Sequence, residues 1–543
     1  MRLVCLLGLM ACFASPARAQ DVPGGGCVTG QAQRLLSNFE LQASLFNTGG
    51  LFFGGSTTFG DGYLIPKDPG ISPIFAAGVW MAGTVGGDPR VAAARYGGWD
   101  FWPGPLEDAA NPPQDCSTHD RIYVVSREDI REYYHTGIAT DDLRDWPHQL
   151  GAPVLDGDGD STNYDLRAGD QPDLIGDMAA WWVMNDAAND HNPSAPIGVE
   201  VRVLAFVYGP DVAQRPMSPV LTQTTFVRYE IVNRNDQPIE EMYTAMFADP
   251  DLGGAGDDYI GTDTLRNMGF VYNDSNEDSS YGIAPPAVGM QILIGPVVGE
   301  DTLGMTSTST FIGGGPNGTQ DPGTPEEYYN YMRGFWGNGL PIYEFGTGFE
   351  QQGAPTTRFF FAGDPVTESH WSEVNIDGAG TNSPQGDRRL VVSTGPYRIE
   401  PGEAQTILFA FPYGRGTSNL QSVAVLQGVA GTLQSIAAEG FFTGQAVDDP
   451  PRPRPRFELA VSRVRPNPSS GAAEVILTLP AEARVRATVV DVLGRQLEVL
   501  VDSELAEGET VLTLPNGLAP GTYVLRVEVT PGVEETIPFT VVR

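Results

Sequence analysis

The stretch Phe226-Val227-Arg228-Tyr229-Glu230-Ile231 alternates apolar and polar side chains, and so does Val199-Glu200-Val201-Arg202-Val203. Successive side chains of a strand point to opposite faces, so this period of two predicts strands with one buried face. Further strands are expected at residues 239–247, 389–393 and 406–411. The 66 glycines and 44 prolines supply turns between them. The sequence therefore predicts an all-β protein whose body is a large β-sandwich with long loops.

One helix is expected to pack on this sandwich, over residues 418–439. Its apolar residues recur at spacings of three and four, namely Leu420, Val423, Leu426, Val429, Leu433 and Ile436. Gly428 and Gly431 lower the helix propensity, so contacts with the sheet must hold the helix in place. A shorter helical turn is expected at residues 325–332.

Residues 1–19 have the order of a secretory signal peptide. Met1-Arg2 precede an apolar run over residues 3–13, and Ala17-Arg18-Ala19 provide small residues for cleavage before Gln20. A lipobox ending at Cys12 is the alternative, with a shorter apolar run. Because no later stretch reaches the roughly 18 apolar residues of a membrane helix, we expect no transmembrane helix in the mature chain.

Two of the four cysteines, Cys5 and Cys12, fall in the expected signal peptide. The other two, Cys27 and Cys116, would reach an oxidising compartment, where a structural disulfide persists. We therefore expect one disulfide between them, with two free thiols as the alternative.

The chain is strongly acidic, with a formal charge of −36. Such a surface repels nucleic acid, so no nucleic-acid partner is expected. The single lysine, Lys67, stands between Pro66 and Asp68 in an expected turn. A phosphate-binding loop and Schiff-base chemistry both need a suitably placed lysine, so we set both classes of site aside.

Residues 448–456 read Asp-Asp-Pro-Pro-Arg-Pro-Arg-Pro-Arg, which favours an extended polyproline II spacer. This linker would separate a β-rich body, residues 20–447, from residues 457–543. The last segment holds five to seven short apolar stretches at regular spacing, broken by glycine and proline. Such spacing predicts a small immunoglobulin-like β-sandwich.

Three motifs follow in order within this last segment: Arg465-Pro466-Asn467-Pro468-Ser469-Ser470-Gly471, Val490-Asp491-Val492-Leu493-Gly494-Arg495 and Leu518-Ala519-Pro520-Gly521-Thr522-Tyr523. Together they resemble the type A C-terminal sorting domain of type IX secretion system cargo. The resemblance implies Sec export to the periplasm, recognition by an outer-membrane translocon, and removal by its sortase with release or attachment to surface lipopolysaccharide. The residues carried over as sorting motif are Pro466, Asn467, Pro468, Gly471, Asp491, Gly494, Arg495, Gly521 and Tyr523.

The body resembles secreted cargo proteins of Bacteroidota-like bacteria over most of residues 40–440. The likeness rests on short motifs, namely residues 75–80 (Phe-Ala-Ala-Gly-Val-Trp), 95–97, 249–253 (Asp-Pro-Asp-Leu-Gly), 363–365 and 386–389. It implies no activity.

Two acidic clusters are candidate calcium sites. The first has carboxylates at positions one, three and five of a glycine-rich loop, followed by one more: Asp156, Asp158, Asp160 and Asp165. Arg167 stands where an EF-hand has its glutamate, so Asp165, Asp170 or Asp173 would have to complete the site. The second follows the strand at 239–247 and comprises Asp249, Asp251, Asp257 and Asp258, with Asp263 nearby. Bound calcium would relieve their repulsion and order long loops.

No catalytic residues are predicted. The five histidines lack zinc spacing, no GxSxG occurs, and the formal GxGxxG at residues 313–318 contains a proline and reads as a loop. Aromatic clusters at 96–102, 181–182 and 335–336 would stack on sugars or fill the core. The sequence indicates a secreted or cell-surface protein of structural or binding character. An extracellular hydrolase acting on polysaccharide is the alternative. Surface lipopolysaccharide and an extracellular glycan are candidate partners.

Overall fold

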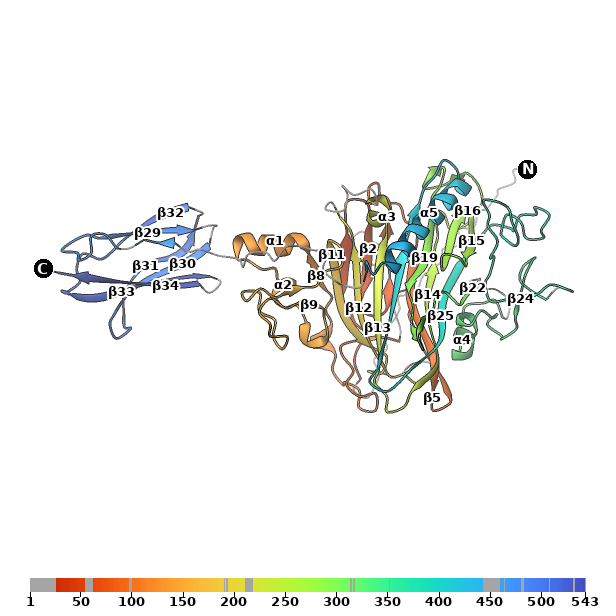
Figure 1. Cartoon of the computed structure of the whole chain (residues 1–543), viewed down its shortest axis with the longest axis horizontal. Helices are drawn as coiled ribbons and strands as arrows, with labels where there is room; N and C mark the ends of the chain where they lie inside the picture. The colour runs from red at the N-terminus through yellow and green to blue at the C-terminus, as the bar shows by residue number, and fades with distance from the viewer. Residues whose placement is uncertain are drawn as a thin grey trace, which may run out of the picture.

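The structure is a computed structural model that describes residues 26–53, 62–96, 100–189, 191, 194–209, 218–312, 315, 318–350, 352–442, 460–462, 464–479, 483–506, 508–530 and 533–542. The expected signal peptide (1–19) and linker (448–456) lie outside these residues. Antiparallel strands dominate the described chain (Figure 1), which confirms the all-β fold.

Two large antiparallel sheets form the body. The first, sheet A, runs β1-β2-β3-β5-β14-β25-β22, with β4 beside β2 and β6 beside β5. Its strands are β1 (Gln33–Ser37), β2 (Gln42–Phe46), β3 (Gly50–Leu51), β4 (Tyr63–Leu64), β5 (Ala76–Val85), β6 (Asp88–Ala93), β14 (Ile239–Asp249), β22 (Ser307–Phe311) and β25 (Arg389–Ile399).

The second, sheet B, runs β15-β16-β19-β26-β13-β12-β11-β7, with β27 beside β19 and β8 beside β11. Its strands are β7 (Trp102–Pro103), β8 (Tyr123–Ser126), β11 (Met178–Asn185), β12 (Val199–Val207), β13 (Thr225–Asn233), β15 (Asp258–Asp263), β16 (Met268–Asn273), β19 (Ala287–Ile294), β26 (Ala404–Phe411) and β27 (Tyr413–Gly414).

The main core lies between the two sheets. On β12, Val201 and Val203 belong to this core, whereas Leu204 and Phe206 belong to a second apolar cluster on the other face of sheet B. The predicted alternation is therefore present. The second face is buried as well, because helices cover it.

The described residues contain five α-helices. The N-terminal half of α5 (Asn419–Ala438) covers β16 and β19, where Val423 and Leu426 join a cluster with Phe270 and Tyr272. Further helices are α1 (Arg127–Thr136), α2 (Asp141–Arg144), α3 (Ser218–Thr222) and α4 (Pro325–Met332), with single 3₁₀ turns at Ser117–His119 and His148–Leu150. Both expected helices are present, and α1 to α3 were not predicted.

Long loops join these elements and carry four small hairpins. These pair β9 (Val154–Leu155) with β10 (Gln171–Pro172), β17 (Glu277–Asp278) with β18 (Gly282–Ile283), β20 (Val297–Val298) with β21 (Asp301–Thr302), and β23 (Ile342–Tyr343) with β24 (Thr356–Thr357). The candidate acidic sites lie in and beside such loops.

The C-terminal residues form a small sandwich of two sheets with an apolar cluster of its own, as expected for an immunoglobulin-like module. One sheet joins β28 (Ala460–Val461), β29 (Glu474–Leu479) and β32 (Gly508–Thr513). The other runs β31 (Gln496–Leu505), β30 (Ala483–Asp491), β33 (Gly521–Thr530) and β34 (Val533–Val541). Figure 1 shows this module (blue) beside the end of the body that carries α1. Across the described ranges, no helix is long and apolar enough to cross a membrane.

Candidate functional site

The three motifs of the C-terminal module meet at one end of its four-stranded sheet. Strand pairing sets Asp491 beside Tyr523, and Tyr523 beside Phe539. Asn467 reaches the same end, because its Oδ1 accepts a hydrogen bond from the backbone N–H of Thr540 (2.9 Å). The other end of β30, at Arg484, faces the body. The motifs therefore gather at the end that points away from the body (Figure 1).

The Asp491 turn at this end is fixed by its own side chains. Asp491 Oδ1 accepts hydrogen bonds from the backbone N–H groups of Leu493 and Arg495, both at 2.9 Å, and Oδ2 accepts one from Arg495 Nε (2.6 Å). These hydrogen bonds, led by that from the Arg495 backbone, lower the pKa of Asp491. Gly494 adopts a left-handed φ of 78°, which favours glycine.

The other two motifs also shape turns. Tyr523 donates its hydroxyl to the carbonyl of Ala519 (2.7 Å), across the loop that leads into Gly521. Ser469 donates its hydroxyl to the carbonyl of Gly471 (2.6 Å), and the peptide bonds before Pro466 and Pro468 are both cis.

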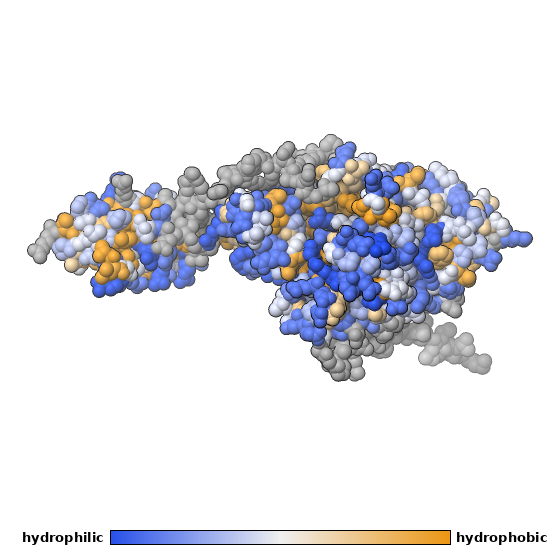
Figure 2. Space-filling model, turned by 60° about the horizontal axis from the view of Figure 1, so that its bottom comes forward, coloured by the Kyte–Doolittle hydropathy of each residue, from blue (hydrophilic) through white to orange (hydrophobic). Residues whose placement is uncertain are grey.

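Apolar side chains remain exposed on the module. They include Val492 and Leu493 at the tip of the Asp491 turn, which are 69% and 74% exposed. Among the described residues of the module, the exposed large apolar side chains are Ile476, Val492, Leu493, Leu497, Val499, Val511 and Val542. Figure 2 shows apolar surface (orange) on the module.

Cys27 and Cys116 form a disulfide across 89 residues of sequence, which confirms the expected pairing. Both are buried beside Trp102 and Ala188. The disulfide ties the start of the described chain to the loop before β8.

In the first acidic cluster, the structure brings together Asp156, Asp158 and Asp170, whose carboxylate oxygens lie within 4.8 Å of one another. Asp170 is buried, and its two oxygens accept hydrogen bonds from the backbone N–H groups of Gly157 (2.9 Å) and Asp165 (2.7 Å). Asp160 and Asp165 are outside the group of three. Their carboxylates accept hydrogen bonds within the loop, from Thr162 and from the Arg167 backbone respectively.

In the second acidic cluster, the convergent residues are Asp249, Asp251 and Asp387, again with carboxylate oxygens within 4.8 Å. Asp249 is the last residue of β14 and Asp387 comes just before β25. These two strands are neighbours, with Ala248 opposite Leu390. Sequence reasoning missed Asp387, because only strand pairing brings it to Asp249.

Burial shifts the titration of this cluster. Desolvation, followed by repulsion from Asp251, raises the pKa of Asp249 to about 7, against the opposing charge of Arg389. Desolvation and repulsion from Asp387 raise the pKa of Asp251 as well. The carboxylates are therefore held where ionisation costs free energy unless a cation is near.

Asp257 and Asp258, the other two predicted ligands, lie on the far side of this loop at the start of β15. Asp258 is fully buried and accepts a hydrogen bond at Oδ2 from the backbone N–H of Leu252 (3.2 Å). Burial raises the pKa of Asp258 well above its usual value, and it also raises the pKa of Asp257, which is close to Asp278. Asp263 instead pairs with Arg266 at 2.6 Å.

Comparison with known proteins leaves the family open. No family model and no curated protein matches the chain. A polysaccharide lyase matches with 7% identity and a TM-score of 0.24, over 95% of this chain and 47% of its own length. The BSP domain of a biofilm associated protein matches with 10% identity and a TM-score of 0.14, over 67% of this chain and 60% of its own length.

Dimeric latent PorU from Porphyromonas gingivalis matches with 9% identity and a TM-score of 0.14, over 94% of this chain and 32% of its own. The chain thus spans about half the length of the lyase and less of PorU. TM-scores of this size do not establish a shared fold, so the site is interpreted from its own geometry.

The tryptophans fill the core. All seven that fall within the described ranges are buried, at 5% exposure or less: Trp80, Trp102, Trp146, Trp181, Trp182, Trp336 and Trp371. None of these seven rings offers a face for a sugar to stack on. The tryptophans of these clusters that lie within the described residues are therefore explained by packing.

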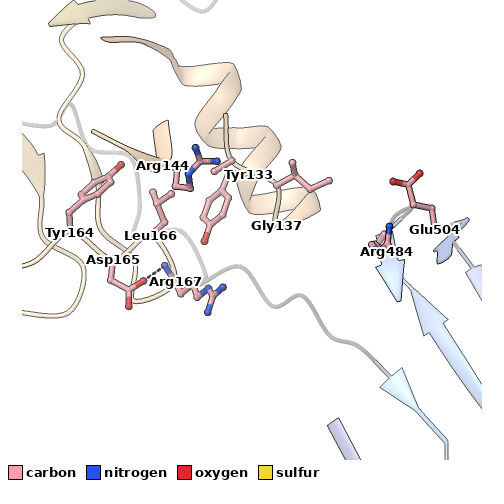
Figure 3. Close-up of a pocket in the computed structure, with 12 residues that line it drawn as sticks. Tyr133, Gly137, Arg144, Tyr164, Asp165, Leu166, Arg167, Arg484 and Glu504 are labelled. Carbon is pink, nitrogen blue, oxygen red and sulfur yellow. Dashed lines mark hydrogen bonds between the residues drawn. The ribbon is translucent and has the colours of Figure 1, made fainter. Parts of the chain in front are cut away.

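An open pocket lies between the α1 region of the body and the nearest edge of the module (Figure 3). The body contributes Tyr133, Arg144, Asp165 and neighbours, and the module contributes Arg484 and Glu504. Figure 3 shows Arg484 and Glu504 across the space from the end of α1. Its two acidic side chains are Asp165 from the body and Glu504 from the module.

Proposed function

We propose that this chain is an exported, extracellular or cell-surface protein of binding or structural character, delivered by its C-terminal module through a type IX secretion system. In this account residues 457–543 form the sorting domain, residues 20–447 form the cargo, and residues 448–456 keep the two apart. The partners are the outer-membrane translocon and its sortase.

One observation carries the proposal: three motifs that are far apart in the sequence converge at the body-distal end of the module. Asn467, Asp491 and Tyr523 are brought together there by strand pairing and by the contact of Asn467 with β34. An end that points away from the body leaves room for a partner to contact these motifs.

The body supports a binding or structural character better than hydrolysis. The described tryptophans are buried, and the two convergent acidic groups lie in loops or at the end of a strand. Carboxylates arranged in this way suit a cation that orders the loops, because binding to the folded state alone adds its free energy to stability.

Deletion of Phe457–Arg543 tests the proposal in a bacterium that carries the secretion system. We expect the truncated body to accumulate, folded, in the periplasm, whereas the full chain becomes accessible to protease added outside the cell. Replacing residues 448–456 with a glycine-serine linker of equal length serves as the control and should preserve delivery. Normal surface delivery of the truncated chain would refute the proposal.

A further inference from the structure

The end of sheet A where β14 stops and β25 starts gathers carboxylates from distant parts of the sequence. Asp249, Asp251 and Asp387 each offer an oxygen within 4.8 Å of the others. Asp249 is 3% exposed, whereas the Asp387 side chain is 49% exposed. The cluster therefore has a buried base and a side open to solvent.

Asp249 has one oxygen that lacks a partner. Its Oδ2 accepts a hydrogen bond from the hydroxyl of Tyr96 (2.8 Å) and faces Arg389 Nη2 at 3.4 Å. Its Oδ1 is buried and has no hydrogen-bond partner. A buried carboxylate oxygen left unpaired costs free energy, and such an atom in a folded protein calls for an explanation such as a bound ion.

The charges of the cluster point to the charge of the ion. When all three carboxylates are ionised, as a bound cation would favour, they contribute three negative charges, and Arg389 contributes one positive charge through its contacts with Asp249 and Asp387, the latter at 2.6 Å. The remaining charge matches one divalent cation. Arg389 holds Asp249 Oδ2 and one oxygen of Asp387, so Asp249 Oδ1 is left for the cation.

The ligand atoms point to the kind of cation. The three converging side chains offer only oxygen, which hard cations prefer, and histidine and cysteine are absent from the group. Calcium accepts an irregular set of carboxylates, whereas magnesium demands a near-octahedral one. The ligands lie on two different loops, which one ion would join.

We infer that Asp249, Asp251 and Asp387 form a calcium site that fastens the loop after β14 to the loop before β25. The site differs from the sequence-based cluster, because Asp387 replaces Asp257 and Asp258. Calcium sites of extracellular modules typically have a Kd of about 10⁻⁴–10⁻³ M, so the inference is compatible with the proposed export but is tested independently of it.

Isothermal titration calorimetry of the purified mature chain with CaCl₂ tests the site. Asp156→Asn and Asp158→Asn are introduced throughout to silence the first acidic loop. In this background we expect one calcium ion to bind, and we expect Asp387→Asn to raise the half-saturating concentration about tenfold, because one ligand charge is lost. Asp301→Asn, an exposed aspartate on the β20–β21 hairpin, is the matched control and should change nothing.

Asp387 is half exposed, so its replacement leaves the fold intact, which circular dichroism verifies. Absence of calcium binding in the background chain would overturn the inference. Equal binding by the Asp387→Asn variant would overturn it too. Because calorimetry uses purified protein, absence of calcium binding does not contradict the export proposal. A failure of export does not contradict calcium binding.

Discussion

Removing the disulfide between Cys27 and Cys116 should destabilise the body by an amount set by the loop that it closes. The two cysteines are 89 residues apart. For a loop of this length, the chain-entropy relation gives about 15 cal/mol/K, or about 4.6 kcal/mol at 25 °C. The figure is the free energy by which the cross-link disfavours the unfolded chain.

The expected change in melting temperature follows from the size of the body. Unfolding of about 420 residues at about 2.1 cal/mol/K per residue has an entropy of about 0.9 kcal/mol/K. Dividing 4.6 kcal/mol by this entropy gives a loss of about 5 °C. The Cys27→Ala/Cys116→Ala double variant should show this loss in differential scanning calorimetry.

Two comparisons separate the cross-link from side-chain effects. The melting temperature of the wild-type protein should fall by the same amount in a reducing buffer. The melting temperature of the double variant should not change when the reductant is added. The reasoning is refuted if the double variant melts within about 1 °C of the wild type, or if the reductant lowers both proteins equally.

Two further predictions concern the core. Trp80 is fully buried and stacks on Phe247 and Phe311, with ring centroids 5.2 and 6.0 Å away. Trp80→Ala should lower the free energy of unfolding in urea by about 3–5 kcal/mol. A loss below about 1 kcal/mol would contradict this packing. Burial raises the pKa of Glu373 to about 7, despite the nearby Arg388. The folded state then holds more protons than the unfolded state between pH 4.5 and 7, so this group lowers stability as the pH rises through that window. The glutamine of the Glu373→Gln variant cannot titrate, so the free energy of unfolding of the variant relative to the wild type should rise by roughly 3 kcal/mol from pH 4.5 to pH 8. If this difference in free energy does not change with pH, the raised pKa of Glu373 is contradicted.

The parts of the fold that carry a local pattern were predictable. The alternation in β12 and β13 predicted both strands, and the spacing of Leu426 and Leu433 predicted α5. β5 was missed because its residues are buried on both faces, which leaves an apolar run without alternation. α1 has few apolar positions, but Ser126 and Asp129 form a capping box that could have revealed it.

The acidic sites were predictable only in part. Asp249 and Asp251 are two residues apart in sequence and are predicted together, whereas Asp387 reaches them through the pairing of β14 with β25. In the first loop, Asp170 was one of three possible partners, and burial within the loop selects it. Contacts that depend on register and burial leave no local pattern in a single sequence.

Removal of residues 457–543 is expected to change the distribution of the body between the periplasm and the cell exterior. Cell fractionation combined with external protease gives this ratio for the truncated and full-length chains. Our account predicts a protease-accessible full-length protein and a folded, protected, periplasmic truncated body. Equal protease accessibility of the two chains would contradict it.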